Sequence, residues 1–382
     1  MKLSKTSDFC ILIDRIFPFA HDATACVASR FVDALRKQGE NTIVCAKAVQ
    51  IRKRRICRIN GVTYVLIRDN DVSMKELSEA AKNSIFLRKL LLFGIAFLEK
   101  RVSKKSAKKR ASFFLKRVGN VMKGSETNNL VLFCGNFYLC DAVKTKTINF
   151  KKSILIATDY WKYYFSDDAL STFGFSKIYV PESVDFSKAN DTSGWRLCRP
   201  FMDDVSKTMR EGMREKGRCC YFGGFYSARD YEKFLNILNA CDFCDVHVFS
   251  NLKKDSCSQN GNIHFEKMRY GKDYFKELSK ADILFVLDNN SAYREWIPSK
   301  MYEAMATHRP ILLFSDSKDS PSWRVLSKYP LALFVDLNDE NAISTIKRGA
   351  ASFSGKVSSK GLFDIYPDCD ASYFLKNVLI RG

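Results

Sequence analysis

Two glutamates near the end of the chain, Glu295 and Glu303, are separated by seven residues. Pro298-Ser299 lies between them and predicts the start of a short helix, and an apolar run after Pro310 predicts a buried strand over Ile311–Phe314. Glu303 would then lie about one turn inside the helix, where a carboxylate can accept hydrogen bonds from vicinal hydroxyls such as a ribose diol. Glu295, before the helix, would face a sugar rather than the ribose.

The start of the same helix has the chemistry of an anion site. We expect the amides of Ser299, Lys300 and Met301 to lack helical partners, and free amides at a helix N-terminus bind phosphate. Lys300 and Arg294 add positive charge. The segment as a whole suits a nucleoside diphosphate joined to a sugar.

This segment resembles the donor-sugar segment of the group-one family of retaining GT-B glycosyltransferases. In that family a Glu-(seven residues)-Glu pair is followed by a stretch like Ala304-Met-Ala, a proline and a short apolar strand. The resemblance is specific across about residues 281 to 314. It implies that Glu303 binds the donor ribose and that Glu295 contacts the transferred sugar and is catalytic.

The resemblance also directs attention to the loop after the first strand of the second half. Family members carry an Arg followed by a Lys there, both touching the donor phosphates. Here Gly223 begins that loop, Arg229 takes the place of the Lys, and Gly224 lies where the Arg is expected. Arg229 is therefore a catalytic candidate that clamps phosphate, Gly223 is a donor-binding candidate, and one cationic contact is lost or comes from elsewhere.

The acceptor side has three candidates in the first half. His21 and Asp22 follow the first predicted strand, where the family usually has a glycine-rich loop that this chain lacks. His21 is either a base or hydrogen-bond partner for the acceptor, or a solvated loop histidine. Asp159 follows another predicted strand, and the aromatic residues after it suit a sugar, a prenyl chain or an ordinary core edge.

These candidates must be positioned by alternating strands and helices. The predicted strands in the first half are Phe9–Asp14, Thr42–Ala46, Leu130–Cys134, Ser153–Ala157 and Lys177–Val180. The second half restarts with the segment Arg218–Gly224, and its further predicted strands are Val246–Phe249, Asn262–Phe265, Ile283–Leu287 and Ile311–Phe314. The pattern predicts an α/β protein with two Rossmann-like lobes, each a parallel sheet flanked by helices, as in the GT-B fold.

The expected domains follow from this pattern. Residues 1–185 form an acceptor-side lobe, residues 186–364 a nucleotide-sugar lobe and residues 365–382 a closing helix.

Charge points to an anionic partner. The formal net charge is +20, and thirteen basic residues with one acid, Glu99, fall between Lys82 and Lys123. The apolar run Leu90–Leu98 is too short to span a bilayer, which needs about 20 residues. Apolar residues from Phe114 to Met122 recur at helical spacing, so we expect segment 82–123 to lie on an anionic membrane surface. Packing of that apolar face on its own domain is the alternative, and no nucleic-acid module is apparent.

Two patterns have the ligand types of a metal site. Cys241 and Cys244, with His247 and Cys257, suit zinc, but a second paired knuckle is missing and a helix end is favoured. Asp69-Asn-Asp71 mimics the metal-binding motif of GT-A transferases and is interpreted as a turn. We expect no metal and no cofactor beyond the nucleotide-sugar substrate, and reduced cysteines in a cytosolic protein.

The resemblance thus implies a hexosyltransferase that moves a sugar from a nucleotide-sugar to a glycan on a polyprenyl-diphosphate lipid. The expected location is the cytoplasmic face of the cell membrane, and the expected role is bacterial surface polysaccharide biosynthesis, such as capsule or O-antigen. A nucleotide-sugar epimerase of GT-B fold and a non-catalytic membrane-bound scaffold are the alternatives.

Overall fold

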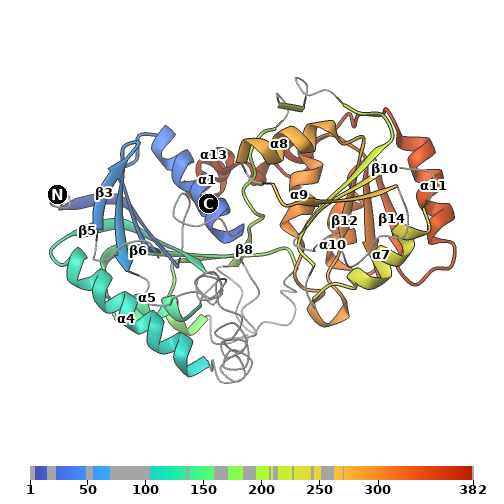
Figure 1. Ribbon diagram of the computed structural model, residues 1–382. Helices are drawn as coiled ribbons and strands as arrows, with labels where there is room; N and C mark the ends of the chain where they lie inside the picture. The colour runs from blue at the N-terminus through green and yellow to red at the C-terminus, as the bar shows by residue number, and fades with distance from the viewer. Residues whose placement is uncertain are drawn as a thin grey trace, which may run out of the picture. The chain divides into compact units, whose positions relative to one another are not determined.

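The computed structural model describes thirteen ranges of the chain: residues 5–14, 23–48, 55–68, 104–134, 137–158, 171–183, 195–205, 208–209, 214–225, 228–241, 245–250, 262–269 and 271–380. The chain divides into two compact units, residues 1–199 and 200–382 (Figure 1).

Unit 1 is built on an eight-stranded sheet in the order β3-β4-β2-β1-β5-β6-β7-β8. All neighbouring strands are parallel except the antiparallel pair β3–β4. The strands are β1 (Thr6–Ile13), β2 (Thr42–Ala48), β3 (Arg55–Ile59), β4 (Val62–Arg68), β5 (Glu126–Cys134), β6 (Asn149–Ala157), β7 (Lys177–Val180) and β8 (Trp195–Leu197).

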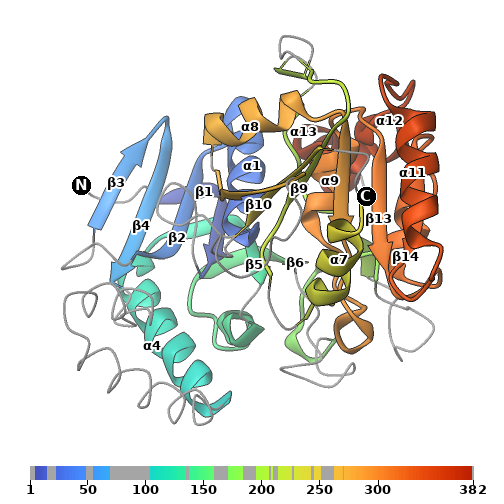
Figure 2. The ribbon, with the colours of Figure 1, turned by 45° about the vertical axis from the view of Figure 1, so that its right-hand side comes forward.

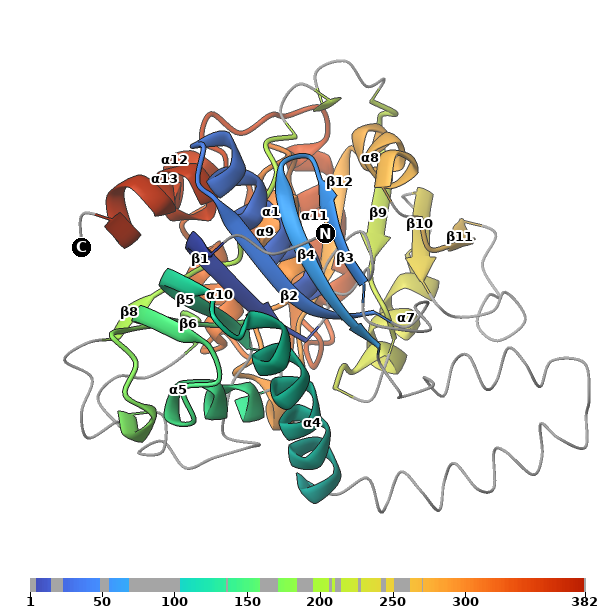
Figure 3. The same ribbon diagram turned by 90° about the vertical axis from the view of Figure 1, so that its left-hand side faces the viewer.

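Both faces of this sheet are covered, which is why its strands are apolar runs rather than alternating patterns. Helix α1 (Ala23–Lys37) packs on one face, where Phe31 meets Phe133 edge-on at 5.2 Å. Helix α4 (Lys104–Met122) lies on the other, in one core with Leu12 and Leu132, and α5 (Asp141–Lys144) follows β5 (Figure 3). Gly39, at φ +81°, follows α1 in the left-handed conformation that commonly ends a helix.

Unit 2 is built on a six-stranded sheet in the order β11-β10-β9-β12-β13-β14, and all its strands are parallel. The strands are β9 (Arg218–Phe222), β10 (Asp245–Ser250), β11 (Ile263–Lys267), β12 (Ile283–Leu287), β13 (Ile311–Ser315) and β14 (Ala332–Asp336).

Helices cover both faces of the second sheet. One core lies between the sheet and α8 (Gly271–Lys280), α9 (Ser299–Met305), α10 (Pro321–Leu326) and α12 (Leu362–Ile365). A second core lies on the opposite face, under α7 (Tyr231–Asn239) and α11 (Ala342–Phe353) (Figure 2). The chain closes with α13 (Ala371–Tyr373) and a π-helix (Phe374–Ile380) that begins with a buried Phe374 packed on Phe201.

The structure corrects the prediction that the apolar face of α4 contacts lipid. Phe114, Leu115, Val118 and Met122 are buried in the core of unit 1. The face of α4 that meets solvent instead carries lysines and Arg117, together with Phe113, which is 43% exposed. Residues 82–103 of the predicted membrane segment lie outside the described residues, and no described helix is both long and apolar enough to cross a bilayer.

Candidate functional site

The topology of unit 2 defines where a ligand would bind. From β9 the chain adds β10 and β11 on one side and then crosses to add β12 on the other side. Open parallel sheets bind ligands at the carboxyl ends of the strands, where the strand order reverses. In this unit that point lies between the ends of β9 and β12, followed by Gly223 and Asp288.

Gly223 is held close against its surroundings. Its amide donates to the carbonyl of Phe249 at 3.1 Å. A Cβ at this position would lie 2.7 Å from Cζ of Tyr221 and 2.9 Å from Nη1 of Arg229. Only glycine fits without displacing these side chains, and a donor-binding role for Gly223 stays a prediction.

Arg229 connects the two loops at the switch point. Its Nη1 donates to the hydroxyl of Tyr221 at 2.9 Å and to the carbonyl of Gly224 at 3.2 Å, while Nε donates to Oδ1 of Asn289 at 3.4 Å. The side chain is 8% exposed. These contacts orient the guanidinium through groups of the protein, and a phosphate contact by Arg229 stays a prediction.

A polar cluster after β12 was not anticipated from the sequence. The buried carboxylate of Asp288 accepts hydrogen bonds from Ser322 at 2.6 Å and Ser315 at 3.0 Å, and so joins the ends of β12 and β13 to α10. Burial raises the pKa of Asp288 despite these hydrogen bonds. Asn289 donates to the carbonyl of Trp296, which ties the loop before α9 to the switch point.

Helix α9 begins at Ser299, as predicted, after an extended Pro298. The expected anion site is smaller than predicted, because the amide of Met301 donates to the carbonyl of Pro298 at 3.0 Å. The side chain of Met301 is buried, so this residue packs α9 against the core of unit 2. Ser299 and Lys300 are half-buried at the helix start.

Glu303 is oriented by two donors that share one of its oxygens. Tyr274 Oη and Lys300 Nζ each lie 2.7 Å from Oε2. Lys300 also lies over the ring of Tyr274, 4.1 Å from its centroid. Within the described residues no donor contacts Oε1, and the side chain is 19% exposed. One carboxylate oxygen is thus fixed by the protein and the other can accept from a ligand.

The ring of Tyr274 places this arrangement near the switch point. It packs edge-on against Phe222, the last residue of β9, with centroids 5.1 Å apart. Tyr274 of helix α8 therefore links Glu303 to Phe222, at the carboxyl end of β9.

Arg294 and Glu295 lie in the loop before α9. Nη2 of Arg294 is 3.4 Å from the carboxylate of Asp316, in the loop after β13, so this cation is already paired. Glu295 is exposed, and its side chain makes no hydrogen bond or ion pair to any described residue. The two glutamates of the sequence motif thus have different surroundings: among the described residues, side-chain partners hold Glu303 but not Glu295.

The acceptor-side candidates His21, Asp22 and Asp159 lie outside the described residues, as does Asp69-Asn-Asp71. Two residues beside these candidates are described. Thr24, in the first turn of α1, lies 3.3 Å from Thr158, which follows β6. The start of α1 and the end of β6 are therefore side by side in unit 1.

No protein-family model and no curated protein sequence matches the chain. The UDP-forming α,α-trehalose-phosphate synthase of Burkholderia vietnamiensis is similar in structure, with a TM-score of 0.59 at 9% identity, covering 96% of this chain and 95% of that one.

Two further solved structures are similar at the same level. Sucrose-phosphate synthase of Thermosynechococcus elongatus matches with a TM-score of 0.55 at 11% identity, and HepE of Anabaena in complex with UDP-glucose with 0.53 at 9%. Each comparison covers 96% of this chain and 94% of the other. The chain therefore has the GT-B fold, with two largely parallel sheets flanked by helices.

Proposed function

We propose that this protein is a glycosyltransferase that uses a nucleotide-sugar donor bound by unit 2. The observation that carries the proposal is the geometry of Glu303, whose Oε2 is held by Tyr274 and Lys300 while Oε1 is left to a ligand. A carboxylate oriented in this way accepts a hydrogen bond from a ribose hydroxyl without having to be reorganised. The solved structures of similar fold include a UDP-forming synthase and a protein bound to UDP-glucose.

The donor diphosphate would lie at the switch point between β9 and β12. Gly223 lies at this point, and the side chains of Tyr221 and Arg229 occupy the space that a Cβ on Gly223 would need. Arg229 and the amides of Ser299 and Lys300 would face the diphosphate, with Arg294 as a further cation once Asp316 is displaced. Positive groups fixed in advance stabilise the charge that develops on a leaving diphosphate.

The transferred sugar would contact Glu295, which is exposed and has no partner among the described residues. We propose a retaining reaction in which the bond between the anomeric carbon and the diphosphate breaks. The oxygen of an acceptor hydroxyl then bonds to the anomeric carbon on the face that the diphosphate leaves. His21, Asp22 and Asp159 are the acceptor-side candidates in unit 1, with His21 as a base. No metal is required in this scheme, since cationic side chains and amides balance the diphosphate.

We propose a lipid-linked glycan as the acceptor, at the cytoplasmic face of a bacterial membrane and within surface polysaccharide biosynthesis. The support is the solvent face of α4. This helix has seven Lys and Arg residues and no Asp or Glu, and Lys108, Lys109, Lys116 and Arg117 are exposed. Because its apolar face is buried, attachment would be electrostatic, with Phe113 as the one large apolar side chain among these exposed cations.

A transfer assay tests this function. The protein is given UDP-, GDP-, ADP- and CMP-linked sugars with either a polyprenyl-diphosphate-linked glycan or a soluble sugar phosphate, and release of the nucleotide is measured. Release that needs the lipid-linked acceptor and survives a metal chelator supports the full proposal. Release with the soluble acceptor instead would keep the transferase and overturn the lipid-linked acceptor, whereas nucleotide binding without any release would favour a non-catalytic role.

A further inference from the structure

Two histidines of unit 2 lie side by side at the edge of its sheet, away from the switch point. His247 on β10 is the register partner of His264 on β11, which is the edge strand. Asp245, two residues before His247, projects from the same face because side chains alternate along a strand. The three residues lie in the first half of their strands, whereas the candidate donor site lies at the carboxyl ends of β9 and β12.

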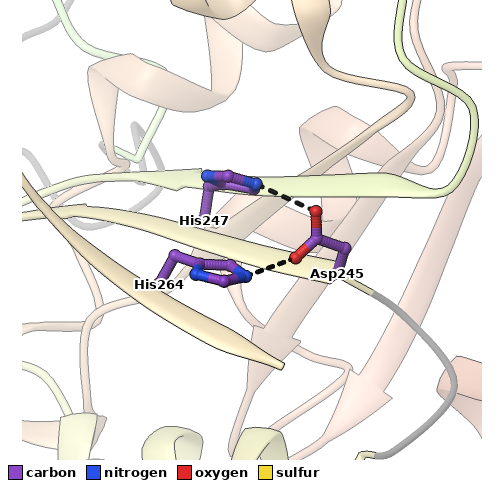
Figure 4. A group of neighbouring side chains, drawn as sticks. All are labelled: Asp245, His247 and His264. Carbon is purple, nitrogen blue, oxygen red and sulfur yellow. Dashed lines mark hydrogen bonds and ion pairs between the residues drawn. The ribbon is translucent and has the colours of Figure 1, made fainter. Parts of the chain in front are cut away.

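The ligand atoms of these three side chains converge. Nε2 of His264 lies 2.7 Å from one carboxylate oxygen of Asp245, and Nε2 of His247 lies 3.1 Å from the other. All three ligand atoms are within 4.8 Å of one another. Figure 4 shows both imidazole rings turned toward the carboxylate. Donors around a tetrahedral zinc ion with bonds near 2.1 Å are about 3.4 Å apart, so small side-chain movements suffice to admit an ion.

A fourth side chain orients one of the histidines. Nδ1 of His247 lies 2.8 Å from Oε1 of Glu266 on β11. A neutral His247 that donates its Nδ1–H to Glu266 presents a lone pair on Nε2 toward the carboxylate of Asp245. In that state a metal ion between Nε2 and the carboxylate would accept both lone pairs, whereas a doubly protonated ring would donate to both carboxylates without an ion. Histidines that bind metals commonly donate their other ring N–H to a carboxylate, which fixes the tautomer and the ring orientation.

The surrounding charges leave the site net acidic. Arg218 on β9 is buried and is the register partner of Asp245, and its charge is compensated by ion pairs with Glu215 and Glu277. Glu266 lies 4.0 Å from Arg218 and 3.7 Å from Arg269. Among the described ion pairs, the partners of Asp245 are the two histidines alone. Asp245 and His264 are about half-exposed, so an ion reaches them from solvent.

We infer that Asp245, His247 and His264 bind a divalent transition-metal ion of the zinc type, with Glu266 orienting His247. Imidazole and carboxylate donors suit zinc, cobalt, nickel and copper, whereas magnesium and calcium prefer oxygen alone. The ion would join β10 to the edge strand β11. The inferred site shares His247 with the zinc pattern weighed from the sequence but uses none of its cysteines. Cys241 is buried and its Sγ donates to the carbonyl of Ile237, while Cys244 and Cys257 lie outside the described residues.

Calorimetric titration of the chelator-treated full chain with Zn²⁺ tests this inference. We expect one Zn²⁺ to bind per chain at the site, and we expect this binding event to be lost in His264→Ala and in Asp245→Asn. Glu266→Ala should keep the event with affinity reduced about 10- to 100-fold. His308→Asn is the matched control, because it removes a histidine far along the chain whose Nδ1 contacts the carbonyl of Ser358, and it should bind Zn²⁺ as the wild type does.

Cobalt distinguishes this site from the cysteines. Co²⁺ bound by nitrogen and oxygen gives visible bands without the strong near-ultraviolet absorption of thiolate ligation. A wild-type spectrum of the first kind that disappears in His264→Ala supports the site. Equal Zn²⁺ stoichiometry and affinity in wild type and His264→Ala, or a thiolate spectrum alone, would overturn it. Circular dichroism of each variant confirms that the fold is retained, as expected for half-exposed positions.

Discussion

The hydroxyl of Tyr274 donates to the same oxygen of Glu303 that Lys300 contacts, at 2.7 Å in both cases. This arrangement spans two helices, since Tyr274 belongs to α8 and Glu303 to α9. It fixes the carboxylate without consuming its second oxygen. The donor site that we propose depends on this asymmetry.

Removing the tyrosine hydroxyl should weaken nucleotide binding while the fold is kept. Tyr274→Phe preserves the packing on Phe222 but frees Glu303 to rotate, and a hydrogen bond to a charged group contributes enough for about a tenfold rise in Kd. Calorimetry measures this. Tyr366→Phe is the control, because it removes another tyrosine hydroxyl, bonded to Val325, and should leave the Kd unchanged.

Phe113 and Phe114 are adjacent on α4 but differ in burial, so substituting each in turn tests the orientation of the helix. Phe114 is 1% exposed, so Phe114→Ala should lower the free energy of unfolding by about 3 to 5 kcal/mol. Phe113 is 43% exposed, and Phe113→Ala should change the free energy of unfolding by less than about 0.5 kcal/mol. Urea denaturation compares them. Equal effects of the two substitutions would contradict the orientation of α4.

The exposed lysines of α4 should govern binding to anionic vesicles. Lys108, Lys109, Lys116 and Lys123 changed together to Gln should reduce co-sedimentation with vesicles containing phosphatidylglycerol, and added salt should have a similar effect. The control changes four exposed lysines of unit 2, Lys318, Lys328, Lys356 and Lys360, with the same loss of charge. A similar loss of binding in both variants would indicate attraction to net charge rather than to α4.

A buried aspartate before β12 should contribute strongly to stability. Asp282 is fully buried, forms an ion pair with Arg214, and accepts hydrogen bonds from Ser354 at 2.6 Å and from the amide of Gly355 at 3.0 Å. Asp282→Asn leaves Arg214 without its charge partner and should lower the free energy of unfolding at pH 7 by about 3 kcal/mol. Asp319→Asn, at an exposed position, should have little effect.

The same variant has a defined pH dependence. Burial alone would raise the pKa of Asp282, but the hydrogen bonds and Arg214 outweigh it and lower the pKa. A lowered pKa in the folded state gives stability that is full above the unfolded value of about 3.9 and is lost as pH falls through the folded value. The stability difference between wild type and Asp282→Asn should therefore be constant near neutrality and shrink below about pH 4. A difference that grew on acidification would contradict this assignment.

Apolar runs predicted most of the sheet positions but not the full strand lengths. The predicted bounds of β7 and β12 agree with the structure, and β12 is buried at every position. Strand β5 begins four residues earlier than predicted, at Glu126, because its polar first half pairs with Thr6 and Ser7 of β1. Hydrogen bonding of a polar strand end leaves no trace in an apolar run.

The candidate site was predicted in part. The start of α9 and the position of Glu303 follow from Pro298, Ser299 and the apolar spacing, which are local signals. Tyr274 and Asn289 were missed because their roles depend on which strands are neighbours. The same holds for His247 and His264, which lie in one row only because β10 and β11 pair in that register.

The most direct test of the proposed donor site is a calorimetric titration of wild type, Glu303→Gln and Glu340→Gln with UDP, GDP, ADP and CMP. Glu340 is an exposed glutamate of the same unit and serves as the matched control. We predict that one nucleotide binds wild type and Glu340→Gln equally, and binds Glu303→Gln at least about tenfold more weakly. Failure of wild type to bind any of the four nucleotides, or equal affinity in Glu303→Gln and wild type, would contradict the proposed donor site.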